Sequence, residues 1–254
     1  MMRRTAFTLA ELLVVIGIIV LLMAILLPAL SGAQQNANTV NCLSNLRQMA
    51  IAAQAYADTY GGSFPIAYYS ASNSTQEVSY SWDFTTTTNV STGQISIEPG
   101  LLWCGDTNAK VQQCPMFFGK SNTLADPYTG YNYNTSYVGH GQFENIVAPA
   151  KPSQIVQPSR CALFGDGQYV SGANKYMRSP FPSAGDASLS ARSAGTQGFR
   201  HRNKTNVAFC DGHAETLSQC FTNTIASQIP LIAAGTGFLS TDNSLYTIDG
   251  TAGP

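Results

Sequence analysis

The residues of this chain that could do chemistry are three histidines, six cysteines and several aspartates in Gly- and Ser-rich stretches. His201, Asp211 and His213 stand near enough in the sequence to meet around a turn and bind a divalent metal. Asp211 and Gly212, however, lie between two strand-like runs, and this dipeptide is a strong hairpin signal. We therefore interpret Asp211 and Gly212 as turn residues, and expect His201 to hydrogen-bond a loop carbonyl or an Asp carboxylate. No metal site is predicted.

The hairpin offers no catalytic arrangement. A two-residue turn at positions 211–212 would place Cys210 opposite His213, and Glu215 opposite Ala208. None of these residues supplies a nucleophile with a base and a third group that orients the base, which covalent catalysis requires. The sequence also lacks a phosphate-binding loop, a dinucleotide fingerprint and a nucleophile elbow. The sequence therefore predicts no catalytic residue and no enzyme.

The cysteines indicate export to an oxidising compartment, where disulfides persist. They are Cys42, Cys104, Cys114, Cys161, Cys210 and Cys220. No pair has the Cys-x-x-Cys spacing of zinc ribbons or thioredoxin-like motifs, and the sequence alone does not settle the connectivity. The candidate disulfides are Cys104 with Cys114, and Cys161 with Cys210 if their strands run antiparallel side by side.

The low charge of the chain argues against a nucleic-acid partner. Charged residues make up 11 % and the formal net charge is −1, whereas typical globular domains have about 25 % charged residues. The basic residues Arg200, Arg202 and Lys204 are interpreted as a solvated loop. Calcium is an alternative because several aspartates lie in Gly/Ser-rich loops, but no EF-hand spacing is present and no cofactor is predicted. These aspartates are Asp166, Asp186, Asp211, Asp242 and Asp249.

A long helix is predicted over residues 7–60, and it is the element that must position the rest. Residues 12–30 carry no charge, and about 20 apolar residues are enough to span a membrane. Two arginines precede this run, which favours a cytoplasmic N-terminus. Pro28 should kink or locally open the helix, and Gly61 with Gly62 should end it.

The second half of the helix, residues 31–62, is amphipathic, with an apolar stripe from Val40 to Tyr60. We expect the stripe to pack on an extracytoplasmic globular domain over residues 63–254. The expected fold class is α+β, with a small antiparallel β-sheet and long loops. Strands are predicted over 131–139, 161–164 and the hairpin arms. Residues 63–89 are interpreted mainly as loop and residues 171–200 as a long surface loop.

The beginning of the chain, residues 3–11 (RRTAFTLAE), resembles the type III signal of type IV pilins and of type II secretion pseudopilins. The resemblance implies that a membrane prepilin peptidase cuts between Ala6 and Phe7 and methylates the new amine. Residues 1–6 would then be the leader. The family usually has glycine before the cut, where this chain has Ala6.

The same resemblance implies a role in filament assembly. Glu11 becomes the fifth mature residue, where the family has a glutamate, and Pro28 becomes the twenty-second, where many members have proline. Residues 7–30 would be the transmembrane and assembly half of the helix. The implied partners are other copies in a homo-oligomeric filament, the peptidase and inner-membrane assembly machinery. The implied location is the inner membrane before assembly, and a periplasmic or extracellular filament afterwards.

A second resemblance lies in the C-terminal part. His201, nine intervening residues, then Asp211 and Gly212 reproduce the H-x9-D-G signature of prepilin-like proteins with a large C-terminal domain. Further landmarks of this subgroup are Cys42 to Gln48, Tyr56 to Asp58, Phe64-Pro65, Cys114-Pro115 and Tyr131 to Asn134. The resemblance implies that His201, Asp211 and Gly212 form a structural motif.

Other interpretations remain open. An ordinary secretory signal could be cut before Gln34, after the small residues 31–33, although the apolar run exceeds the usual core of about 7–15 residues. A membrane-tethered or secreted surface protein, either a carbohydrate-binding module or a hydrolase, is the alternative function.

Overall fold

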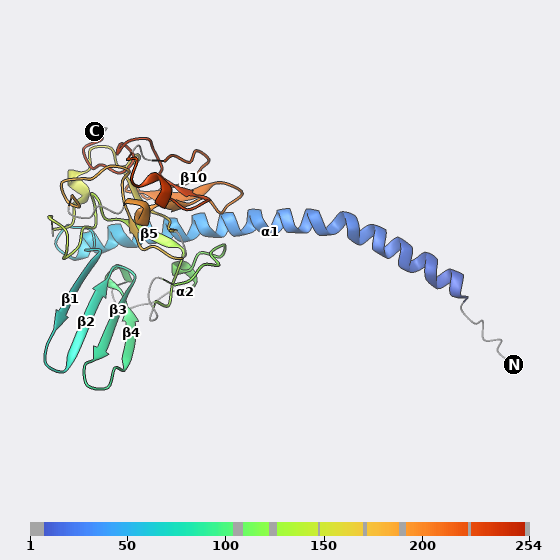
Figure 1. The fold of residues 1–254 in the computed structure, drawn as a ribbon, viewed down its shortest axis with the longest axis horizontal. Helices are drawn as coiled ribbons and strands as arrows, with labels where there is room; N and C mark the ends of the chain where they lie inside the picture. The colour runs from blue at the N-terminus through green and yellow to red at the C-terminus, as the bar shows by residue number, and fades with distance from the viewer. Residues whose placement is uncertain are drawn as a thin grey trace.

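The structure, a computed structural model, describes residues 8–103, 109–121, 126–146, 148–169, 172–187, 192–222 and 225–251. A long N-terminal helix projects from a head that is built around its C-terminal half (Figure 1). The head contains a four-stranded, a five-stranded and a two-stranded sheet. This arrangement confirms the α+β class, with one long apolar helix followed by a domain with small sheets.

Helix α1 (Leu9–Thr59) contains 51 residues and is apolar and long enough in its N-terminal half to cross a membrane. It begins with a capping box, in which the Thr8 hydroxyl accepts the Glu11 N–H and the Glu11 carboxylate accepts the Thr8 N–H. The helix continues through Pro28 without interruption, and its ribbon bends in the N-terminal half (Figure 1). The predicted kink is thus present only as a bend in a continuous helix.

The C-terminal half of α1 buries one face. The buried residues recur every three or four positions: Cys42, Leu46, Met49, Ala50, Ala53 and Ala57. Val40 and Tyr60 were expected in this stripe but are 64 % and 51 % exposed. Val40 lies two residues, or about 200° around the helix, from Cys42 and therefore faces away. Tyr60 follows the last helical residue, where Gly61 and Gly62 take positive φ values of 76° and 77° and end the helix as predicted.

Residues 63–89, expected mainly as loop, instead begin an antiparallel sheet that projects from the head (Figure 1). Its strands are β1 (Tyr68–Ser72), β2 (Gln76–Ser81), β3 (Phe84–Asn89) and β4 (Ile95–Pro99). Asn73 closes the first turn by accepting backbone N–H groups, and Asn89 closes the last turn in the same way. The strands are rich in Ser and Thr, and β2 and β4 leave most of their residues exposed or half-buried. Their apolar alternations are short, Val78 with Tyr80 and Ile95 with Ile97, and therefore give only a weak strand signal.

The second sheet has the strand order β10-β9-β6-β5-β7. Its strands are β5 (Tyr131–Asn134), β6 (Ala162–Asp166), β7 (Tyr176–Met177), β9 (Thr205–Phe209) and β10 (Ala214–Leu217). All neighbours are antiparallel except β5 and β7. Helix α1 packs against β6, β9 and β10, so the predicted contact between the amphipathic half and the head is present. Strands β8 (Gln197–Gly198) and β11 (Thr236–Gly237) form the small third sheet, and α2 (Ala109–Gln112) is a single turn beside α1.

The β9–β10 hairpin has three loop residues, not two. Glu215 pairs with Val207 and not with the expected Ala208. The Gly212 N–H donates to the Phe209 carbonyl over 2.9 Å, and Gly212 is the only loop residue with positive φ, 91°. A turn followed by a glycine of positive φ is the usual three-residue hairpin with a bulge. The prediction of a two-residue turn was therefore wrong by one residue.

The shifted register also separates Cys210 from His213. The Phe209 N–H donates to the His213 carbonyl over 2.9 Å, and the two rings stack with centroids 4.6 Å apart. Cys210 turns toward β6 and donates its N–H to the Cys161 carbonyl over 3.0 Å. A buried backbone N–H needs a hydrogen-bond partner, and the bond from Cys210 to Cys161 therefore favours this position of the turn.

The described part of residues 171–200 is not the expected surface loop. It contains β7, β8 and the short helix η3 (Arg192–Gly195), and its charged side chains lie inside the head. Arg192 is fully buried and pairs with Asp186 over 2.8 Å, while Arg178 reaches the same carboxylate over 3.3 Å. A composition rich in Gly and Ser is typical of a surface loop. Here the small side chains instead leave room for buried ion pairs.

Candidate metal centre

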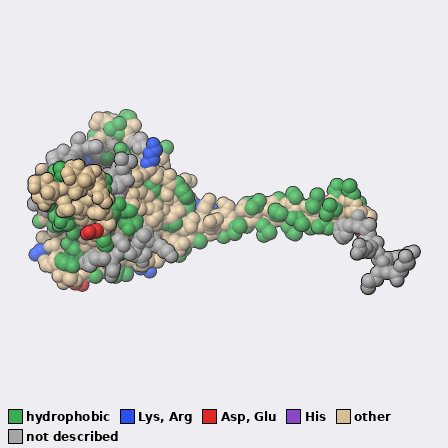
Figure 2. Space-filling model, turned by 90° about the horizontal axis from the view of Figure 1, so that it is seen from below, with side chains coloured by type: hydrophobic (Ala, Val, Ile, Leu, Met, Phe, Trp, Pro, Cys, Tyr) green, Lys and Arg blue, Asp and Glu red, His purple; other side chains and the backbone are tan. Residues whose placement is uncertain are grey.

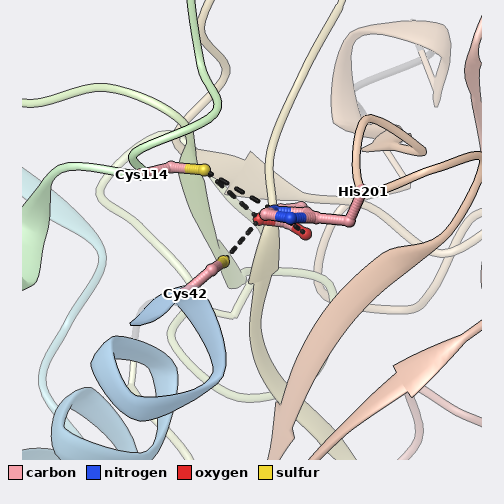
Figure 3. A group of neighbouring side chains, drawn as sticks. Cys42, Cys114 and His201 are labelled. Carbon is pink, nitrogen blue, oxygen red and sulfur yellow. Dashed lines mark hydrogen bonds and ion pairs between the residues drawn. The ribbon is translucent and has the colours of Figure 1, made fainter. Parts of the chain in front are cut away.

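Four potential metal ligands meet where the helix enters the head: Cys42, Cys114, Asp166 and His201. Each belongs to a different segment, because Cys42 is on α1, Cys114 follows α2, Asp166 ends β6, and His201 lies between β8 and β9. Figure 3 shows Cys42, Cys114 and His201 pointing toward one another. One ligand atom from each of the four residues lies within 4.8 Å of all the others. We call this group the four-ligand cluster.

The individual distances within the cluster are short. Cys42 Sγ lies 3.2 Å from Asp166 Oδ1, and Cys114 Sγ lies 3.8 Å from the same oxygen. His201 Nε2 lies 3.8 Å from Cys114 Sγ and 3.3 Å from Asp166 Oδ2. All four residues are at most 2 % exposed. The cluster is therefore a closed site inside the protein.

A hydrogen bond from α1 orients the His201 ring. The Thr39 hydroxyl lies 3.2 Å from His201 Nδ1 and donates its single hydrogen to the Gln35 carbonyl, one turn earlier, over 2.9 Å. Toward His201 the hydroxyl can therefore only accept, so Nδ1 carries a hydrogen. The other ring nitrogen, Nε2, is the one that faces the two thiols and the carboxylate.

The other three ligands also have outer partners. The Asn206 N–H donates to Asp166 Oδ2 over 2.7 Å, and Arg200 Nη2 pairs with Asp166 Oδ1 over 3.1 Å. Arg200 Nε also donates to Cys114 Sγ over 3.3 Å. The Tyr131 hydroxyl hydrogen-bonds the Cys42 thiol. Every member of the cluster is thus held by a group outside it.

The two thiols of the cluster have pKa values that are shifted in opposite directions. Burial, together with the hydrogen bond to Cys114, raises the pKa of Cys42 well above its usual value. Burial also opposes ionisation of Cys114, but the hydrogen bond from Cys42 and the Arg200 guanidinium lower its pKa to about 5. At neutral pH one thiolate therefore forms, on Cys114.

The histidine and the carboxylate form an ion pair. Burial disfavours the charged imidazole, but hydrogen bonds to Asp166 and Cys114 outweigh it and raise the pKa of His201 to about 9. Burial likewise opposes ionisation of Asp166, and Arg200 and His201 overcome it and keep its pKa below the usual value. A thiolate next to an imidazolium is also the arrangement of thiol nucleophiles, but Cys114 is only 1 % exposed and is closed to a substrate.

From the sequence, the members of this cluster were expected to have unrelated roles. His201 does not meet Asp211 and His213, which pair with each other over 2.5 Å at the exposed hairpin turn. Asp211 shapes that turn by accepting the His213 N–H, as expected. His201 contacts an Asp carboxylate, that of Asp166, which was also expected. Cys42 was noted only as a family landmark. No local spacing signals the cluster, since its members lie far apart in the chain.

The cysteines behave differently from the expected disulfides. Cys114 is a free thiol in the cluster, and its proposed partner Cys104 lies outside the described residues. Cys161 and Cys210 are free, buried thiols that hydrogen-bond each other. Their strands β6 and β9 do run antiparallel side by side, as the pairing requires. The disulfide between them is not formed in this structure and stays a prediction.

The remaining candidate residues have structural partners or lie outside the described part. Ala6 and Phe7 fall outside it. Among the loop aspartates, Asp242 and Asp249 each accept a backbone N–H two residues ahead. Arg200 was expected in a solvated loop but its side chain is 10 % exposed, because it is drawn inward by Asp166.

The chemistry of the four-ligand cluster is that of a closed metal site. Sulfur, imidazole and carboxylate ligands together suit zinc and related thiophilic metals in four-coordinate geometry. Four protein ligands leave no position for a substrate, which distinguishes structural from catalytic zinc sites.

Comparison with protein-family models, with curated proteins and with solved structures gives no match for this chain.

Proposed function

We propose that this chain is a subunit of an extracytoplasmic filament of the type IV pilus or type II secretion kind, held in the inner membrane by α1 before assembly. The observation that carries the proposal is the N-terminal half of α1. It projects from the head (Figure 1), and its side chains are mainly apolar on the face that Figure 2 shows. Every large apolar side chain from Leu9 to Leu30 is at least 42 % exposed. Such a surface is stable only in lipid or against other apolar helices.

The position of Glu11 supports the same proposal. Its carboxylate accepts both the backbone N–H and the hydroxyl of Thr8, over 2.9 and 2.8 Å, at the start of an otherwise apolar run. A carboxylate in an apolar environment requires a compensating charge. After cleavage between Ala6 and Phe7, the amine of Phe7 in a neighbouring subunit would supply that charge.

The experiment that tests this proposal is determination of the mature N-terminus. The full chain is expressed in a bacterium with and without an active prepilin peptidase, and is purified from membranes. Intact mass and N-terminal sequencing should show a start at an N-methylated Phe7 only when the peptidase is present. A start at Gln34 in both strains would identify an ordinary signal peptide and overturn the proposal.

A further inference from the structure

We propose that the four-ligand cluster binds one zinc ion, which clamps helix α1 to the head. The ligands are Sγ of Cys42 and Cys114, one carboxylate oxygen of Asp166, and Nε2 of His201. This proposal concerns the stability of each subunit and does not depend on filament assembly.

The geometry of the cluster matches a tetrahedral site. Zinc bonds of about 2.0–2.3 Å at the tetrahedral angle place neighbouring ligand atoms about 3.3–3.8 Å apart. Asp166 Oδ1 lies 3.2 Å from Cys42 Sγ and 3.8 Å from Cys114 Sγ, and Cys114 Sγ lies 3.8 Å from His201 Nε2. His201 Nε2 lies 3.3 Å from the other oxygen of Asp166, Oδ2. The three separations within one set of atoms fit the tetrahedral range, and all four ligand atoms lie within 4.8 Å of one another, so a zinc ion would draw the remaining pairs together by about 1 Å at most.

The surroundings of the cluster match those of metal sites. Ligating histidines almost always donate their second ring N–H to an outer acceptor, which aims the other nitrogen at the metal. Thr39 fills this position for His201, since its hydroxyl can only accept from Nδ1. Arg200 and the Asn206 N–H hold Asp166 in the same way.

The formal charges of the ion, its ligands and Arg200 also sum to zero. A zinc ion carries +2, the two thiolates and the carboxylate together carry −3, and the adjacent Arg200 guanidinium carries +1. The buried site is then neutral, which avoids the large cost of an uncompensated charge inside a protein. A carboxylate as the fourth ligand, with Arg200 beside it, gives this balance without a further partner.

The clamp lies where the helix and the head are joined. Cys42 is the first buried residue along α1, and three of the six buried residues are alanines, which offer little apolar contact area. The other three ligands come from the segment after α2, from β6 and from the loop before β9. One ion would thus connect the helix to three parts of the head at the point where the projecting half begins.

The test uses the full chain, purified in detergent without chelators from cells grown with added zinc. Elemental analysis should find about one zinc per chain. Replacement with Co²⁺ should give the d–d absorption of a tetrahedral site together with thiolate-to-cobalt charge transfer. Cys42→Ser should reduce the charge-transfer intensity by about half, and His201→Ala should lower the metal content. Cys161→Ser is the matched control, because Cys161 is equally buried but lies outside the cluster, and it should retain the wild-type content and spectrum.

The wild-type chain decides the outcome even where a variant fails to fold. Absence of metal from the wild type, with no cobalt charge-transfer band, would overturn the proposal. A metal content and a charge-transfer band that are the same in folded Cys42→Ser and wild type would overturn it too, because the ion would then be held elsewhere. Peptide mapping without reduction that shows a disulfide between Cys42 and Cys114 would replace the metal clamp by a covalent one. One zinc with two thiolate ligands in both the wild type and Cys161→Ser confirms it.

Discussion

The Thr39 hydroxyl and the His201 imidazole lie 3.2 Å apart, and this contact joins the exposed helix to the buried cluster. Thr39 is half-buried one turn before Cys42, on the same side of α1. Because its hydrogen is donated to the Gln35 carbonyl, it fixes which nitrogen of His201 is free. One helical turn therefore supplies both a member of the four-ligand cluster and the group that orients another member.

Replacement of Thr39 by valine tests this orienting role. The variant keeps the side-chain shape but removes the acceptor, and loss of such an outer partner typically lowers metal affinity about 10- to 100-fold. We expect that decrease for zinc, measured by competition with a chromophoric chelator in the full chain. Thr39→Ser keeps the hydroxyl and should bind like the wild type. Equal affinities for Val and Ser would show that Thr39 does not position the ring.

The buried ion pair of Asp186 and Arg192 should make stability depend on acid. Burial opposes ionisation of Asp186, but Arg192 keeps the pKa of this carboxyl below its ordinary value. Its contribution is therefore complete above the unfolded pKa of about 3.9 and is lost as the pH falls through the lower folded value. Asp186→Asn should lower the free energy of unfolding by about 3–5 kcal/mol at pH 7, because the buried Arg192 guanidinium loses its carboxylate counter-charge. On acidification the variant should lose less stability than the wild type.

Chemical unfolding of the full chain at pH 7, 4 and 2.5, followed by tryptophan fluorescence, measures this difference, because the loss begins only below the unfolded pKa of about 3.9. Asp249→Asn is the control, since Asp249 is an acid at an exposed turn and its replacement should change stability by no more than about 0.5 kcal/mol. Parallel pH profiles for Asp186→Asn and the wild type would contradict the assignment.

Gly212 should be sensitive to substitution for a backbone reason only. Its φ of 91° is strained for residues with a Cβ, whereas the nearest atom to an added Cβ, on Gln54, is 3.5 Å away and leaves room. Gly212→Val should cost about 1–3 kcal/mol, and Gly212→Asn clearly less, because asparagine accepts positive φ more readily. Thermal unfolding of both variants measures the order. If the two variants lose the same stability, side-chain packing and not backbone strain is responsible.

Glu11 should be required for assembly and not for folding of the head. Among the described residues, its side-chain hydrogen bonds reach only Thr8, in the same helical turn. Glu11→Ala should leave the thermal unfolding of the head unchanged and leave monomer in the membrane with few filaments in negative-stain images. Glu11→Gln keeps the capping geometry without the charge, so it separates capping from charge pairing. Wild-type filament yield from both variants would refute the pairing with Phe7.

The sequence by itself determined the elements whose signals are local. The uncharged run after Glu11 predicts a long apolar helix, and Gly61 and Gly62 end it, because helix periodicity and positive φ act within a few residues. The strand at Ala162 and the hairpin at Gly212 were likewise found from neighbouring residues. The strand predicted over 131–139 is present only as Tyr131–Asn134, because the chain turns at residues 135–138. The role of Asp211 in the turn needed no knowledge of the rest of the fold.

Only the tertiary structure decided what depends on distant contacts. The β1–β4 sheet has only short apolar alternations among many Ser and Thr residues, and the hairpin register depends on the partner that Cys210 finds in Cys161, just before β6. The four-ligand cluster is the clearest case: Cys42 and Asp166 are 124 residues apart, and Cys114 and His201 are 87 apart. Ligand sets of this kind have no sequence spacing to detect, because the packing of α1 against β6 and β9, and not the chain between them, brings their atoms together.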